Sequence, residues 1–196
     1  MSTYKKNLEL LTKNNVYSKE MEHDACGVGL IASTEGKKSR EVVEYGIEAL
    51  KAVWHRGAVD ADGKTGDGAG IHLEIPKDFF VEKIEVTGHT HDGSDICVGM
   101  IFLPRNDYSS QESCKTIVES ELTKNDFSIY GWRQVPVNPK VLGEKAFQTM
   151  PEIIQVLFKS NDKNLLDKEL ERKIYETRKK IAVSYTHLTL PTTSKV

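Results

Sequence analysis

Cys26, in the stretch EHDACGVGLIA (residues 22–32), is the first side chain whose type and position suggest chemistry. Cysteine reacts as its thiolate, and a free thiol of pKa about 8.5 is only a few per cent ionised at pH 7. The surrounding residues contain no conventional dyad, although His23 lies three residues upstream. Cleavage before Cys26 would supply a base on the same residue, because a new α-amino group has an ordinary pKa of about 7.7–8.0. Cys26 is therefore a candidate amino-terminal nucleophile; the alternative is a small buried cysteine in a glycine-bearing strand.

Arg56 is the second candidate, because it stands in the triplet HRG where an apolar helical pattern ends. A guanidinium at such a point can bind a carboxylate through two parallel hydrogen bonds. The alternative is a surface arginine that caps the helix. Arg56 is thus suited to binding a substrate carboxylate, but the sequence is equally compatible with a capping role.

The loop DADGKTGDGAG (residues 60–70) is rich in glycine and aspartate and must adopt unusual backbone angles. It lacks the Lys-Ser/Thr pair of a phosphate-binding P-loop. A helix precedes it and a strand follows it, which is the reverse of a dinucleotide-binding fingerprint. We interpret residues 65–70 as the wall of a tight pocket, with Asp67 orienting a ligand amine or a backbone amide.

Other candidates for chemistry are weaker. His89 and His91 lie in GHTHDGSD, a stretch of turn-forming residues without a third ligand at metal-binding spacing, so no metal site is expected. Cys97 and Cys114 both lie in apolar-periodic segments and are predicted to be core residues.

The elements that must position these residues mix strands and helices. Several predicted strands are adjacent in sequence, which favours an α+β or layered architecture over a strict βαβ repeat. Ser39 is expected to cap the first helix, and Ser109 with Glu112 to form a capping box for the second. Strands are predicted over residues 26–33, 71–75, 96–103, 127–137 and 152–158, and helices over residues 39–54, 109–122 and 166–181.

Composition excludes several classes of function. The formal net charge is −2 and apolar residues make up 38%, so neither nucleic acid nor an anionic membrane surface is an expected partner. No run approaches the ~18 apolar residues that span a bilayer, and the N-terminus lacks the apolar stretch of a secretory signal. Three cysteines without an export signal indicate reduced thiols in the cytoplasm.

The pattern divides the chain into three parts. Residues 1–25 are polar and poorly periodic, and are predicted to be a leader or propeptide. Residues 26–183 carry the candidate domain. Residues 184–196, SYTHLTLPTTSKV, are rich in Thr and Ser after a highly charged helix, and we interpret them as a non-native tail without function.

Five motifs in order resemble one family. EHDACGVG, HRGAVDADGKTGDGAGI, IPKDFF, VGMIFLPR and GWRQVPVN are similar to the start of glutamate synthase large chains, over about residues 22–181. The resemblance implies a class II glutamine amidotransferase domain. Its fold would be the four-layered αββα sandwich of the N-terminal-nucleophile hydrolases, in an α+β class, incomplete at its C-terminal end.

The resemblance also assigns roles. Cys26 would be the nucleophile that attacks the glutamine side-chain amide, after removal of residues 1–25, and Arg56 would hold the α-carboxylate of glutamine. Thr65, Gly66, Asp67 and Gly68 would wall the same pocket. In the full-length family, ammonia is added to 2-oxoglutarate with the help of FMN, a 3Fe-4S cluster and an electron donor or small subunit.

One departure qualifies this assignment. The family places an Asn-Gly pair downstream to stabilise the oxyanion, and no Asn-Gly occurs in this chain. The chain therefore resembles a truncated front end of the family. Loss of an oxyanion donor costs roughly 10²–10³ in rate, so we expect this chain to be inactive or very poor alone. The alternatives are another class II glutamine amidotransferase, or a non-catalytic binding module with a degenerate pocket.

Overall fold

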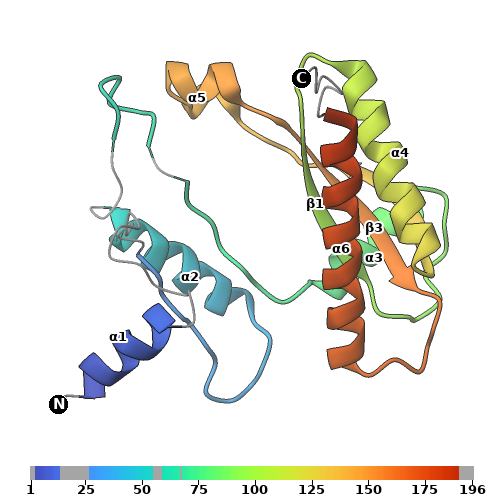
Figure 1. The fold of residues 1–196 in the computed structure, drawn as a ribbon, viewed down its shortest axis with the longest axis horizontal. Helices are drawn as coiled ribbons and strands as arrows, with labels where there is room; N and C mark the ends of the chain where they lie inside the picture. The colour runs from blue at the N-terminus through green and yellow to red at the C-terminus, as the bar shows by residue number, and fades with distance from the viewer. Residues whose placement is uncertain (1–2, 14–26, 55–58, 67, 190–196) are drawn as a thin grey trace. The chain divides into compact units, whose positions relative to one another are not determined.

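A computed structural model describes residues 3–13, 27–54, 59–66 and 68–189 (Figure 1). The chain divides into two compact units. One comprises Met1–Asp60 and Gly66–Ile71, and the other comprises Ala61–Thr65 and His72–Val196. No helix in the described part of the chain is long and apolar enough to cross a membrane.

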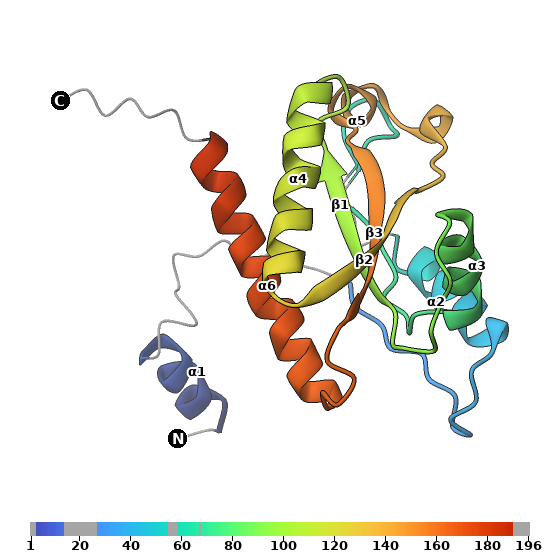
Figure 2. The same ribbon diagram turned by 90° about the vertical axis from the view of Figure 1, so that its right-hand side faces the viewer.

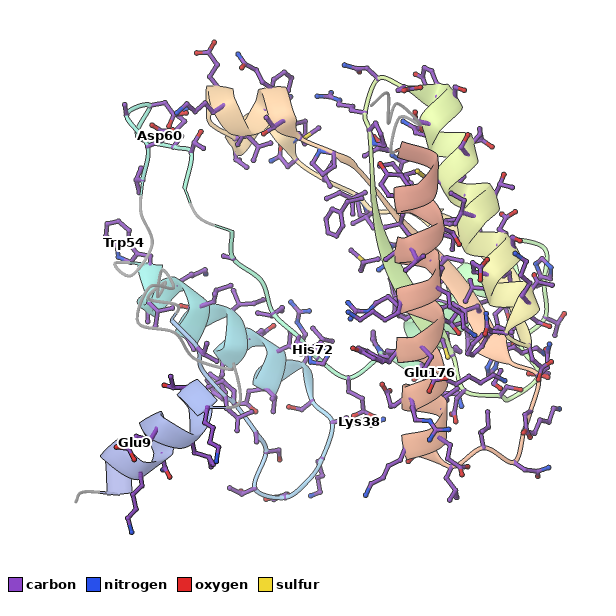
Figure 3. The ribbon with its side chains drawn as sticks, viewed as in Figure 1. Glu9, Lys38, Trp54, Asp60, His72 and Glu176 are labelled. Carbon is purple, nitrogen blue, oxygen red and sulfur yellow. The ribbon has the colours of Figure 1, made fainter. Side chains whose placement is uncertain are left out.

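The first unit contains helices α1 (Thr3–Lys13) and α2 (Arg40–Ala52). The predicted start of α2 is confirmed, because the Val42 N–H donates to Ser39 Oγ at 3.3 Å. Its apolar stripe is not buried: no residue of α2 is fully buried, and Trp54, just beyond the end of the helix, is 74% exposed (Figure 3). Helix α1 was not expected from the sequence.

Two strand predictions are wrong. Residues 27–33 and 71–75 form no strand in the structure, although their apolar residues alternate. Val28 is 91% exposed and Leu30 is 89% exposed. A strand exists only when its backbone pairs with a neighbour, and alternation alone supplies no partner.

The second unit is built on a three-stranded antiparallel sheet. Its strands are β1 (Cys97–Leu103), β2 (Phe127–Gln134) and β3 (Glu152–Ser160), in the order β1-β3-β2. All three lie where the sequence predicted strands. Strands β1 and β3 pack closely where Gly99 pairs with Val156, since a Cβ at Gly99 would lie 2.8 Å from Val156 Cγ1. Strand β2 is irregular between Ile129 and Gly131.

Helices cover both faces of this sheet. Helices α4 (Tyr108–Lys124) and α6 (Asp167–Thr189) pack on one face, and α3 (Lys77–Val86) packs on the other. Figure 2 shows α4 and α3 on opposite sides of the strands. Alternate residues of β3 serve the two layers, since Val156 and Phe158 face α4 whereas Leu157 faces α3. Leu157 is completely buried, which stabilises the fold by about 1.5–3 kcal/mol.

Helix ends differ from the predictions in detail. Asp107, not Ser109, caps α4, and its carboxylate accepts from the Ser110 N–H at 3.0 Å. The carboxylate also accepts from Ser110 Oγ at 2.6 Å, which leaves no capping box at Ser109. Helix α6 continues to Thr189, beyond the predicted end at residue 181. Three short elements were not expected: α3, the 3₁₀ turn Pro139–Val141 and α5 (Glu144–Thr149).

The fold is therefore mixed α+β, as predicted, with helices on both sides of an antiparallel sheet. The two wide apolar clusters lie against this sheet. The loop that begins at Ala61 belongs to the same unit and contributes nothing to either cluster. Its geometry is fixed by polar contacts instead.

Candidate functional site

The structure describes half of the predicted site. Cys26, Arg56 and Asp67 lie outside the described residues. Thr65, Gly66 and Gly68 are described, and Thr65 is partly buried whereas the two glycines are exposed. The geometry of the loop around Thr65 is therefore the part of the site that the structure defines.

Asp62 organises this loop through its carboxylate. Oδ1 accepts from the backbone N–H groups of Lys64 at 2.9 Å and Thr65 at 2.7 Å. Oδ2 accepts from the Thr65 hydroxyl at 2.5 Å. Gly63 has a φ of +67°, a left-handed conformation in which glycine avoids steric strain. The sequence DGKT thus forms a tight turn closed on one carboxylate.

The same carboxylate reaches a second element. After Thr65 and Lys64, the backbone of Glu144, the first residue of α5, makes a small contribution to the lowered pKa of Asp62. Gly143, the N-cap residue of α5, has no side chain to cap that helix. A Cβ at Gly143 would lie 2.6 Å from the Thr65 nitrogen and closer still to Thr65 Oγ1 and Asp62 Oδ2. The loop and the start of α5 are therefore in direct contact.

Asp62 carries its charge throughout the neutral range. The hydrogen bond from the Thr65 hydroxyl, followed by those from the backbone N–H groups of Thr65 and Lys64, lowers the pKa of Asp62 to about 2. An ionised carboxylate accepts several hydrogen bonds at once, and such bonds are stronger than neutral ones.

Gly66 ends this loop in a different way. Its backbone pairs with Val59 in an isolated antiparallel bridge, which joins the two ends of the segment. Around Gly68 the structure leaves open space, since a Cβ there would meet nothing within 4 Å.

His89 and His91 have structural partners. The Gly93 N–H donates to His91 Nδ1 at 3.3 Å, so His91 Nε2 is the nitrogen that donates to the Ser94 carbonyl at 2.8 Å. His89 Nδ1 lies 3.1 Å from Thr87 Oγ1. The described residues include no group of three or more His, Cys, Asp or Glu side chains placed to hold a metal ion.

Asp92 anchors the same loop to the sheet. Its carboxylate accepts from Lys159 Nζ at 2.8 Å and from the Tyr130 hydroxyl at 3.3 Å. The hydrogen bond from Lys159, with further ones from Ser94, holds the pKa of Asp92 well below its usual range. These contacts hold the connection between α3 and β1 against the sheet, which is a structural role.

The two described cysteines are poor nucleophiles. Cys97 is buried in the sheet, as predicted, and burial raises the pKa of its thiol to about 12. Cys114 is partly buried rather than fully in the core, and burial also raises its pKa. Neither thiol supplies an appreciable thiolate fraction at neutral pH.

Sequence reasoning missed Asp62 and Gly143. The sequence does contain a signal for Asp62. An aspartate side chain can close a turn by accepting hydrogen bonds from the backbone N–H groups two and three residues later. No local pattern marks Gly143, since the residues it contacts lie far upstream in the chain.

Comparison with known proteins gives one family match and several relatives. The family of class II glutamine amidotransferases matches residues 26–194. A glutamate synthase [NADPH] large chain from Azospirillum brasilense is 51% identical over 181 residues, which is 92% of this chain and 12% of that protein. Ferredoxin-dependent glutamate synthases from Pyropia yezoensis and Arabidopsis thaliana (form 1) are 39% and 41% identical, over 88% and 82% of this chain. The chain spans about a tenth of the length of these relatives.

Proposed function

Because the chain belongs to the class II glutamine amidotransferases, we propose that it forms the glutamine-hydrolysing part of a glutamate synthase. The observation that carries this proposal is the ordered similarity to glutamate synthase large chains over nearly the whole sequence. The family match begins at Cys26, the residue that cleavage after Ala25 would make amino-terminal. The chemistry proposed for that residue needs both its thiol and its free amine.

The proposed reaction proceeds in two halves. The Cys26 thiolate attacks the side-chain carbonyl carbon of glutamine, and the terminal amine, which has taken the thiol proton, delivers it to the departing nitrogen. Ammonia leaves and a glutamyl thioester remains. The amine then removes a proton from water, the resulting hydroxide attacks the thioester, and glutamate departs as the thiol is restored.

Two features would bind the substrate in this scheme. Arg56 would hold the α-carboxylate of glutamine through a forked pair of hydrogen bonds. Thr65, Gly66, Asp67 and Gly68 would wall the pocket, with the position of Thr65 set by the turn at Asp62. The Asn-Gly pair that stabilises the oxyanion in the family has no counterpart in this sequence.

The architecture and domain limits belong to the same proposal. We expect the complete domain to be a four-layered αββα sandwich, with residues 1–25 removed as a propeptide. A domain over residues 26–183 and a non-native tail over 184–196 remain predictions; α6 crosses the second boundary and the family match extends to residue 194.

The cysteines that the structure describes do not fit the 3Fe-4S cluster of the full-length family. A 3Fe-4S cluster is held by several cysteine thiolates. Of the cysteines that the structure describes, Cys97 is buried within the sheet core and Cys114 lies on α4. We propose that FMN, the cluster, the electron donor and the addition of ammonia to 2-oxoglutarate belong to other parts of a longer cytoplasmic protein, since the chain matches 12% of a glutamate synthase large chain.

Labelling with a glutamine analogue that alkylates thiols tests the proposed site. The intact protein, here and below, is the complete glutamate synthase that would contain this chain. In that protein at pH 7.5, we expect one equivalent of label on Cys26 and none on Cys97 or Cys114, whose raised pKa values suppress their reactivity. Mass spectrometry of the digested protein locates the label, and excess glutamine should protect against it. Label distributed over all three cysteines, or unaffected by glutamine, contradicts a specific site at Cys26.

A further inference from the structure

We propose that Asp62 is a positioning residue for glutamine binding, which holds Thr65 against the start of α5. This inference rests on the proposed function, because Thr65 is assigned to the glutamine pocket only through the family resemblance. Asp62 itself would not touch the substrate. It would act through Thr65, which begins the sequence TGDG.

Thr65 is restrained twice by one side chain. Its backbone N–H donates to Asp62 Oδ1 at 2.7 Å and its hydroxyl donates to Asp62 Oδ2 at 2.5 Å. The first bond fixes where the backbone of Thr65 lies, and the second selects the rotamer of its side chain. With both bonds formed, Thr65 enters the pocket loop in one arrangement.

The turn also packs directly against the start of α5. Gly143, the N-cap residue of that helix, has no side chain, and Asp62 and Thr65 lie against it. This close approach requires glycine at position 143, because a Cβ there would overlap with Asp62 and Thr65. Gly143 is therefore the complementary half of the same contact.

The contact has little role in holding the fold together. Residues 61–64 are exposed, and neither apolar cluster of the sheet includes any residue of the turn. Loss of the Asp62 carboxylate should therefore free Thr65 locally while the sheet and its helices remain folded. This separates a positioning role from a structural one.

Kinetics of the intact protein with Asp62→Asn test the inference. Asparagine keeps one oxygen for the N–H groups but presents an amide NH₂ where Oδ2 accepted the Thr65 hydroxyl. We expect KM for glutamine to rise about tenfold with kcat within about twofold of wild type, since misplaced binding groups weaken substrate binding. Gly143→Ala should raise KM similarly. The effects of Asp62→Asn and Thr65→Ala on KM should be less than additive in the double variant, because the two residues are coupled by direct hydrogen bonds.

Asp78→Asn is the matched control, since Asp78 is an exposed aspartate of α3 and loses the same charge. An unchanged KM in Asp62→Asn overturns the inference, and so does a lowered melting temperature with unchanged KM, which would reveal a purely structural role. Cys26→Ala distinguishes the two levels: if it abolishes hydrolysis while Asp62→Asn is normal, only the positioning role is wrong. If Cys26→Ala remains active, the proposed function and this inference fail together.

Discussion

Replacing Cys26 by alanine is expected to lower kcat for glutamine hydrolysis by at least about 10⁴-fold in the intact protein. Removing the nucleophile of a covalent mechanism costs rate factors on the order of 10⁶ in a well-studied hydrolase. Cys26 would supply the attacking sulfur, so its loss leaves no route to the thioester. Release of glutamate and of ammonia from glutamine, followed separately, measures the effect.

Cys97→Ala and Cys114→Ala are the controls for this experiment. Each removes one thiol elsewhere, and neither thiol has the pKa of a nucleophile. Both variants should retain kcat within about twofold, although Cys97→Ala removes part of a buried cluster and is expected to lower stability. A Cys26→Ala protein with more than about a tenth of wild-type kcat contradicts covalent catalysis by this residue.

Arg56→Ala is expected to raise KM for glutamine by about 10²-fold. A desolvated charge pair between a guanidinium and a substrate carboxylate is worth about 2–5 kcal/mol when one partner is removed. Arg56→Lys should recover part of the loss, because lysine keeps the charge but not the forked geometry. Steady-state rates over a wide range of glutamine concentration separate KM from kcat.

The comparison for Arg56 is Arg40→Ala. Arg40 forms an exposed i,i+4 ion pair with Glu44, with a 3.1 Å distance between Nε and Oε1, and such surface pairs contribute little. We expect Arg40→Ala to leave KM unchanged. Equal KM values for Arg56→Ala and wild type would remove Arg56 from the proposed pocket.

The sequence predicted correctly the strands whose alternating apolar pattern is matched by a paired neighbouring strand in the structure. β1, β2 and β3 lie where strands were expected, and Ser39 caps α2 as expected. Residues 27–33 show the limit, since they alternate as a strand does but have no paired neighbour. Periodicity indicates which face of a segment is apolar, and it does not identify the surface that covers that face.

The candidate site shows a similar division. Motifs in fixed order were enough to predict the family, which the comparison confirms. They also drew attention to residues 65–68, without indicating what holds this loop. The contact of Asp62 and Thr65 with Gly143 joins segments far apart in the chain, so no local rule predicts it. Asp107 at the start of α4 is a smaller example, because Ser109 offered an equally good local signal.

The central claim is that sulfur and amine act together on one terminal residue, and the mass of the mature amino terminus tests it most directly. Intact-mass and peptide analysis of the active protein from its native host should give a chain that begins at Cys26 with a free amine, and a variant that blocks cleavage after Ala25 should release no ammonia from glutamine. An active protein that retains residues 1–25 would contradict the account.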